Sequence, residues 1–250
     1  MSKVFIGIGH GGNDPGAIAN GLRESDLALS IGLEVERFLK SKGVTTKISR
    51  TTDINDDLND KIRRCNQFAP DLAIDIHINA GGGEGFEAYY YHGGGTSFIM
   101  ARNIEQEVLK MGQVSRGLKT KLNSSGSDFF GWIRLVNAPS VILEAAFIDN
   151  AKDVERIRTE AGRKKFARAY ANGILATLGT YGLIEDVPVA EEVQTQAIYK
   201  TFDDVPSFGK PTIQKLMNRG ALKGDASGNI NIPHEILRAY VVNDRMGLYD

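Results

Sequence analysis

The sequence predicts an α/β protein in which helices flank both faces of a twisted, mostly parallel sheet, followed by a small helical C-terminal module. Three runs of apolar or β-branched residues read as buried strands, and each of them leads to an ionisable side chain. Helical patterns separate these runs, and strands that alternate with helices favour a parallel sheet covered on both faces. The three runs are residues 4–8, 72–78 and 140–144.

Composition limits the kinds of protein that this chain can be. Apolar residues make up 42% of its 250 residues, which is enough for a sizeable core in one large domain plus a small module. Its 30 basic and 31 acidic residues nearly cancel, so we expect no bulk electrostatic binding to nucleic acid or to a membrane surface. The single cysteine, Cys65, rules out an intrachain disulfide and a cysteine-rich zinc site. Any metal must therefore be held by histidines and carboxylates.

The first part of the chain alternates between strand and helix signals. A glycine-rich turn follows residues 4–8, and a helical pattern then begins near Leu27, with Ser25 or Asp26 as its expected cap and Gly43 as its stop. A short strand is expected over residues 44–49 and a second helix over residues 58–68, before Pro70. The buried run 72–78 ends in an open turn of small residues.

The middle of the chain repeats this alternation. We expect a strand over residues 85–91, a helix over 96–111, a polar loop over 124–131 and a long helix over 161–178. The buried run 140–144 lies between the polar loop and the long helix, and Glu144 is expected at its end.

The character of the sequence changes after this long helix. We expect one domain over residues 1–180, a linker over 181–200, where periodicity is weak, and a module over 201–250. The module is expected to contain two short helices around a turn, the first ending at Gly220 and the second beginning at Pro233. Two short helices bury little apolar surface, so the module is expected to need a partner surface or a second copy.

Three ionisable residues, His10, His77 and Glu144, are expected at or just beyond strand ends, and Glu24 is expected at a helix start. The carboxyl ends of parallel strands meet at one edge of a sheet, so these groups should lie close together. Two imidazoles and a carboxylate are a common ligand set for catalytic zinc, and a further carboxylate can transfer protons. Alternatively, Glu144 caps a helix or forms a salt bridge, and His77 bonds to backbone.

Four blocks of the sequence resemble the zinc-dependent N-acetylmuramoyl-L-alanine amidases of the Amidase_3 type. They occur in order over about residues 3–178. The first contains the run Gly-His-Gly-Gly-Asn-Asp-Pro-Gly-Ala and then Glu24, and the others are a histidine strand, a Gly-Phe-Glu-Ala-Tyr-Tyr strand and a strand with Glu144. The blocks span residues 9–24, 50–80, 85–90 and 139–150.

This resemblance implies that His10, Glu24 and His77 are ligands of Zn²⁺ and that Glu144 is the catalytic carboxylate. It also implies hydrolysis of the amide between N-acetylmuramic acid and the first L-Ala of the stem peptide in peptidoglycan. Three positions depart from the pattern of the family: Ile8 stands where an acidic or small residue is frequent, Asp75 where Ser is frequent and Lys61 where Arg is common. Asp75 points to the same side of its strand as His77, either as its partner or in a salt bridge.

The C-terminal part resembles an S-layer-homology-like cell-wall-binding module, through its apolar spacing and its glycines. The resemblance implies binding to a secondary wall polymer of a Gram-positive cell, and such modules usually act in several copies. Self-association of the chain through this module is therefore an expectation. The alternative is a structural tail that packs on the catalytic domain. The matching positions are Phe202, Asp203, Asp204, Val205, Ile213, Leu216, Gly220, Leu222, Gly224, Asn229, Ile230, Pro233, Leu237 and Arg238.

Together these features indicate a phage or prophage endolysin that acts on a Gram-positive cell wall. No signal-peptide pattern follows Met1, so we expect synthesis in the host cytoplasm and holin-type release. The alternatives are a bacterial autolysin or spore-lysis amidase, a zinc carboxypeptidase acting on wall peptides, and a wall-binding protein without catalysis.

Overall fold

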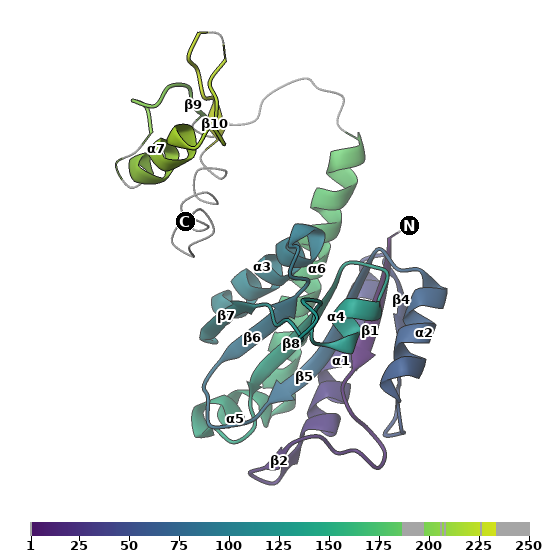
Figure 1. Ribbon diagram of the computed structural model, residues 1–250. Helices are drawn as coiled ribbons and strands as arrows, with labels where there is room; N and C mark the ends of the chain where they lie inside the picture. The colour runs from purple at the N-terminus through teal and green to yellow at the C-terminus, as the bar shows by residue number, and fades with distance from the viewer. Residues whose placement is uncertain (1, 187–197, 206, 208, 226, 234–250) are drawn as a thin grey trace. The chain divides into compact units, whose positions relative to one another are not determined.

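The computed structural model describes residues 2–186, 198–205, 207, 209–225 and 227–233, and the chain divides into two compact units (Figure 1). The first unit spans residues 1–186 and the second spans residues 187–250. In the described part of the chain, no helix is both long enough and apolar enough to cross a membrane.

A six-stranded sheet forms the centre of the first unit, with the strand order β4-β1-β5-β8-β6-β7. Four neighbouring pairs are parallel, and β6 runs antiparallel to β8, so the expected mostly parallel sheet is confirmed. A separate two-stranded hairpin, β2 with β3, lies just before the first helix. The strands are β1 Lys3–Ile8, β2 Ile18–Ala19, β3 Leu22–Arg23, β4 Thr45–Ile48, β5 Leu72–Asn79, β6 Phe86–Tyr90, β7 Ser115–Lys119 and β8 Ser140–Phe147.

Helices cover both faces of this sheet (Figure 1). Helices α1, α3 and α6 pack together on one face, where the larger core cluster is fully buried. Helices α2 and α4 cover part of the other face, over a smaller cluster around Phe5 and Trp132. The helices are α1 Glu24–Ser41, α2 Leu58–Phe68, α3 Gly95–Lys110, α4 Gly131–Leu135, α5 Ala151–Ile157 and α6 Glu160–Asp186.

The sheet register brings three distant parts of the chain side by side. Strand β8 lies between β5 and β6, which are consecutive in the sequence but are not neighbours in the sheet. In this register Glu144 of β8 lies opposite His77 of β5 and also opposite Glu87 of β6. Strands pair side by side with alternating faces, so these three side chains share one face of the sheet.

Some expected boundaries were wrong. Helix α1 begins at Glu24, so Ser25 and Asp26 lie inside the helix and neither caps it; the N-cap position is Arg23. Strand β8 continues to Phe147, so Glu144 lies within the strand rather than at its end. The predicted helix over residues 58–68 matches α2 at both ends, and β5 begins at the expected Leu72.

The second unit has a small core of its own. Helix α7, Lys210–Asn218, packs Ile213 and Leu216 against a two-stranded pair formed by β9, Ile198–Tyr199, and β10, Ile232–Pro233. The first expected helix of the module is therefore present, and Gly220 follows it with φ +70°. Pro233 lies in strand β10 and not at a helix start, because it pairs with Ile198. The rest of the expected second helix lies outside the described residues.

Candidate functional site

Glu24 lies in the first turn of helix α1, and its side chain points to the edge of the sheet. Its carboxylate is almost fully buried. Oε2 accepts a hydrogen bond from the Ala17 amide at 2.9 Å, and Oε1 accepts one from the Ile78 amide at 3.0 Å. The short β2–β3 hairpin before α1 leads the chain to this position. Two backbone donors therefore fix the carboxylate before any ligand arrives.

His10 follows strand β1 in the glycine-rich turn, and its backbone has φ +58°, in the left-handed region that a non-glycine residue seldom adopts. This conformation turns the imidazole toward Glu24, with Nε2 at 3.2 Å from Oε1. The other ring nitrogen, Nδ1, lies 2.7 Å from Oδ2 of Asp14. The hydrogen bond with Glu24 is the main cause of a raised pKa at His10.

His77 lies near the end of strand β5, and carboxylates flank both of its ring nitrogens. Nδ1 lies 3.0 Å from Oε1 of Glu24, and Nε2 lies 3.4 Å from Oδ2 of Asp75. Burial lowers the pKa of His77, but its contacts with Asp75 and Glu24 outweigh burial and raise it to about 10. A Cβ atom at Gly9 would lie 2.5 Å from Cε1 of the ring, so only glycine leaves room for the imidazole.

His10, Glu24 and His77 form the group that could hold a metal ion among the described residues, since their ligand atoms all lie within 4.8 Å of one another. Oε1 of Glu24 is 3.0 Å from one imidazole nitrogen and 3.2 Å from the other. Donors of a tetrahedral zinc site lie about 3.3–3.6 Å apart, so a small expansion fits the ion. Both histidines lower the pKa of Glu24 against the opposing effect of burial, so this carboxylate is ionised and able to bind.

Glu144 lies beside this group but is not part of it. Burial raises the pKa of its carboxyl to about 7, and the nearby carboxylates of Glu24 and Glu87 act in the same direction, against the charge of His77. A carboxyl group with a pKa near neutrality can both accept and return a proton at physiological pH. The structure thus brings together the four residues expected from the sequence.

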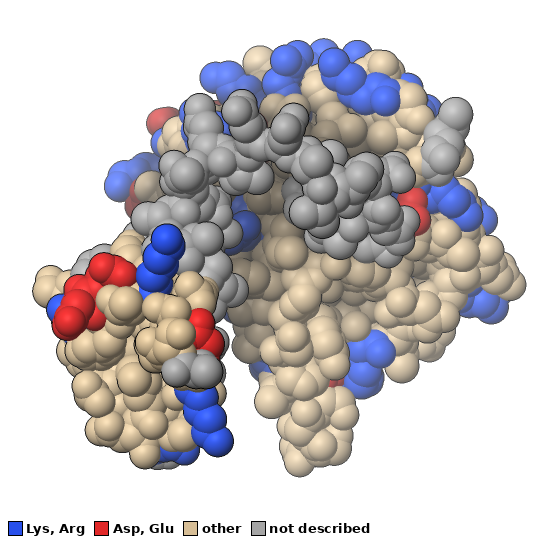
Figure 2. Space-filling view, turned by 90° about the horizontal axis from the view of Figure 1, so that it is seen from above, with Lys and Arg blue, Asp and Glu red and all other residues tan. Residues whose placement is uncertain are grey.

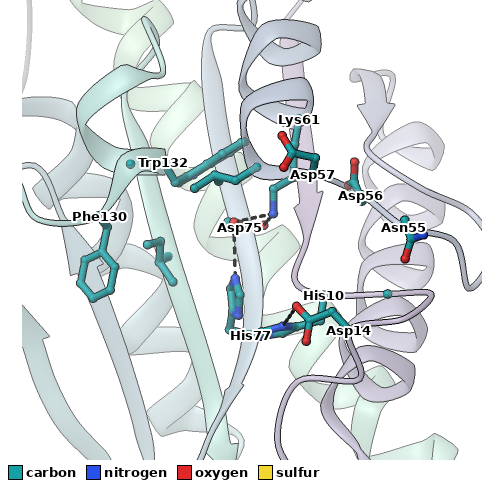
Figure 3. Close-up of a pocket in the computed structure, with 14 residues that line it drawn as sticks. His10, Asp14, Asn55, Asp56, Asp57, Lys61, Asp75, His77, Phe130 and Trp132 are labelled. Atoms are coloured by element: carbon teal, nitrogen blue, oxygen red, sulfur yellow. Dashed lines mark hydrogen bonds and ion pairs between the residues drawn. The ribbon is translucent and has the colours of Figure 1, made fainter.

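A cavity of about 520 Å³ opens beside the two histidines (Figure 3). Helices α2 and α4 form its sides, and its lining includes Lys61, Asp75 and Trp132 together with the acidic loop Asn55–Asp57. Figure 3 shows the Lys61 amine and the His77 ring approaching the Asp75 carboxylate from two sides. This cavity lies next to the candidate metal group and has space for a substrate.

Sequence reasoning missed three supporting residues. Asp14 contacts His10, which lies four residues earlier in the same glycine-rich turn. Arg50 is buried and donates to the carbonyl oxygens of Gly9 and Ser25, which ties the turn to helix α1. Glu87 accepts from Asn79 and pairs with basic residues of β7. The contacts of Arg50 and Glu87 join segments from different elements, so no spacing in one sequence marks them.

A family model described as N-acetylmuramoyl-L-alanine amidase, Amidase_3, matches residues 4–176. The chain belongs to this amidase family. Among curated relatives of this amidase, CwlM of Bacillus licheniformis, an N-acetylmuramoyl-L-alanine amidase, is 37% identical over 178 residues, which cover 70% of this chain and 68% of the relative. The endolysin of Bacillus phage SPP1 is 34% identical over 183 residues, or 71% of this chain and 67% of the relative.

Solved structures agree with the family assignment. Cwp6 from Clostridium difficile superposes with a TM-score of 0.70 at 33% identity, covering 71% of this amidase and 29% of that chain. The N-acetylmuramoyl-L-alanine amidase AmiC2 of Nostoc punctiforme gives a TM-score of 0.65 at 27% identity, covering 71% of this chain and 97% of that one. The family match covers most of the first unit of the chain.

Proposed function

We propose that this amidase hydrolyses the amide between N-acetylmuramic acid and L-Ala in peptidoglycan, with Zn²⁺ held by His10, Glu24 and His77. The observation that carries the proposal is the convergence of two imidazoles on one buried carboxylate oxygen, at 3.0 and 3.2 Å, beside a carboxyl of raised pKa. Family membership supports the choice of bond.

The donor set suits zinc because it contains two imidazoles and one carboxylate and no thiolate. When bound, zinc would act as a Lewis acid that polarises an amide carbonyl and makes water more acidic. Glu24 is held by the amides of Ala17 and Ile78, which keeps its oxygen directed at both imidazoles. The two histidines would offer Nε2 of His10 and Nδ1 of His77 to the ion.

Glu144 is proposed as the general base and acid. Its position within strand β8, opposite His77, places it next to the metal group without being part of it. In the proposed reaction its carboxylate takes a proton from the attacking water and then delivers that proton to the departing L-Ala nitrogen. The backbone at Glu144 is held on both sides, because β8 pairs with β5 on one side and with β6 on the other.

Digestion of purified peptidoglycan tests the reaction. The full chain, loaded with Zn²⁺, should release intact stem peptides whose L-Ala amino termini are free, as detected by mass spectrometry. Glu144→Gln serves as the matched inactive control. Freed D-Ala in place of free L-Ala termini would contradict the proposal and favour a wall carboxypeptidase.

We further propose an endolysin role on a Gram-positive wall, with an autolysin or spore-lysis role as the alternative. Similarity to the SPP1 endolysin supports the first role, and 36% identity to a sporulation-specific amidase of Bacillus subtilis supports the second. The second unit of the chain is proposed to bind a wall polymer. Expression of the full chain together with a holin separates the roles, because only the endolysin role requires lysis from within after the holin acts.

A further inference from the structure

We propose that Asp75, held by Lys61, is a positioning residue that fixes the imidazole of His77 with Nδ1 directed at the metal group. This inference rests on the zinc centre proposed above. It concerns the side of the imidazole away from the ion, where Nε2 lies 3.4 Å from Oδ2 of Asp75 (Figure 3).

The Asp75 carboxylate is held by a buried cation. Both of its oxygens lie 2.8 Å from Nζ of Lys61, and the two side chains are only 3% and 5% exposed. A carboxylate paired with a cation through both oxygens can only accept hydrogen bonds, so Nε2–H of the imidazole is the donor side of the 3.4 Å contact.

The surroundings leave the carboxylate little freedom to move. A Cβ atom at Gly7 would lie 2.5 Å from Oδ1 of Asp75, so the backbone of β1 bounds it on one side. Lys61 also lies near the carbonyl oxygen of Ile8, at 3.4 Å, and 5.5 Å from the ring centre of Trp132. Strand β1 and helices α2 and α4 thus fix the ion pair, and the ion pair in turn fixes one edge of His77.

This arrangement favours one orientation of the imidazole. With Nδ1 directed at the ion, the ring proton is on Nε2, and an acceptor-only partner there holds the ring in that orientation. The same logic holds at His10, where Asp14 faces the nitrogen away from Glu24 at 2.7 Å. Asp14 is 68% exposed, however, so water competes for it, whereas the Asp75 side chain is only 3% exposed and water competes less. The larger effect should therefore come from Asp75.

Zinc affinity of the full chain, measured by competition with a chromogenic chelator, tests the proposal. Loss of a carboxylate that orients a ligating histidine typically weakens metal binding by about 10–100-fold. Asp75→Asn should lie in this range, because an amide accepts the Nε2–H hydrogen bond more weakly than a carboxylate and can also turn its NH₂ group toward the ring. In the zinc-loaded protein, the ¹H shift of Nε2–H of His77 should move upfield in this variant, because its charged acceptor is lost.

Removal of one partner of a buried ion pair can destabilise the fold, so a second variant separates folding from positioning. Lys61→Met/Asp75→Leu replaces the pair with apolar side chains of similar size, a change that is often neutral for stability. We expect this double variant to melt near the wild-type temperature and still to bind zinc about 10–100-fold more weakly. Lys61→Arg keeps a cation beside Asp75, so this variant should retain most of the wild-type zinc affinity.

Asp128→Asn is the matched control. Asp128 is also a buried aspartate, and its Oδ2 lies 2.8 Å from Nδ1 of a histidine, His92, that is not in the metal group. Its variant should keep wild-type zinc affinity. If the folded double variant and Asp75→Asn also kept it, with His77 shifts unchanged, the positioning role would be overturned. Retained zinc in His10→Ala/His77→Ala would instead overturn the zinc centre itself.

Discussion

Each candidate imidazole ligand has a carboxylate at both of its ring nitrogens. Glu24 contacts both rings on the inner side, while Asp14 and Asp75 contact the outer nitrogens of His10 and His77. Without a metal, the inner contacts require a proton, which is why the pKa values of both histidines are raised. Zinc would replace that proton, so the protein scaffold is complete before the ion arrives.

Substitution of any one of the three ligands should remove zinc and lysis together. Each single variant keeps only two of the three zinc donors, and a site with two donors binds the ion far more weakly. The variants are His10→Ala, Glu24→Ala and His77→Ala. Zinc content of the purified variants, by elemental analysis, and clearing of wall suspensions are the measurements. Full zinc and full activity in His10→Ala/His77→Ala would show that the site lies elsewhere.

Glu144→Gln should separate metal binding from catalysis. The amide keeps the shape of the side chain but cannot accept a proton, so zinc should stay bound while turnover falls by about 100-fold or more. Activity on soluble wall fragments and zinc content, measured on the same preparation, decide this. A variant that lost zinc as well would make Glu144 a ligand.

The same substitution should stabilise the metal-free protein at high pH. The folded pKa of Glu144, about 7, lies above its ordinary value of 4.5, so the fold favours the protonated form. Its contribution to stability is therefore complete below pH 4.5 and is lost as the pH rises through 7. Glu144→Gln should melt above wild type at pH 8 and close to it at pH 4, by calorimetry. Equal differences at both pH values would contradict a raised pKa at Glu144.

At the scale of elements, helix α6 contains a matched pair of glycines. At Gly173 a Cβ atom would lie 2.5 Å from Cα of Ile104 in α3, whereas at Gly179 no atom lies within 4 Å. Gly173→Ala should force the two helices apart and cost about 1–3 kcal/mol. Gly179→Ala should stabilise the helix by about 0.5–1 kcal/mol. Thermal melting of both variants checks the opposite signs, and a lower midpoint for Gly179→Ala would contradict the described packing.

Sequence patterns predicted those elements whose signal is local. Helix α2 and strand β5 have clear apolar spacing and clear stops, so their positions were found. Strand β7 was missed because it is a sheet-edge strand of mostly polar residues, and α4 because five residues hold little periodicity. The site residues were predicted through four linked blocks, but the pairing of Lys61 with Asp75 depends on how α2 packs on the sheet.

At the scale of the whole molecule, acidic and basic residues are almost equal in number, with a formal net charge of −1. On the face shown in Figure 2, Lys and Arg side chains form several separate groups among uncharged residues. Some basic residues of the chain are paired within helices, as Arg37 is with Glu34 and Lys164 with Glu160. Attachment to a wall should therefore depend on a specific unit rather than on overall charge.

Truncation after residue 186 should separate catalysis from wall attachment. The first unit has its own sheet and core, so it should fold, bind zinc and cleave soluble fragments, but bind intact walls poorly. The described part of the second unit buries a small core around Ile213 and Leu216, which favours pairing with a second copy. Light scattering should give a dimer for the full chain and a monomer for residues 1–186. Monomeric masses for both at micromolar concentration would contradict self-association.

The place of strand β8 in the sheet has a consequence for how the protein matures. It is the last strand of the sheet to be synthesised, yet it lies between β5 and β6, which must stay apart until it enters. Its entry closes the sheet, and the same event delivers Glu144 to a position opposite His77. Long-range pairing of this kind forms slowly, because the entropy of closing a long loop opposes it. A nascent or broken chain without β8 would lack Glu144, the proposed base, so under the proposed mechanism it should not cleave the wall.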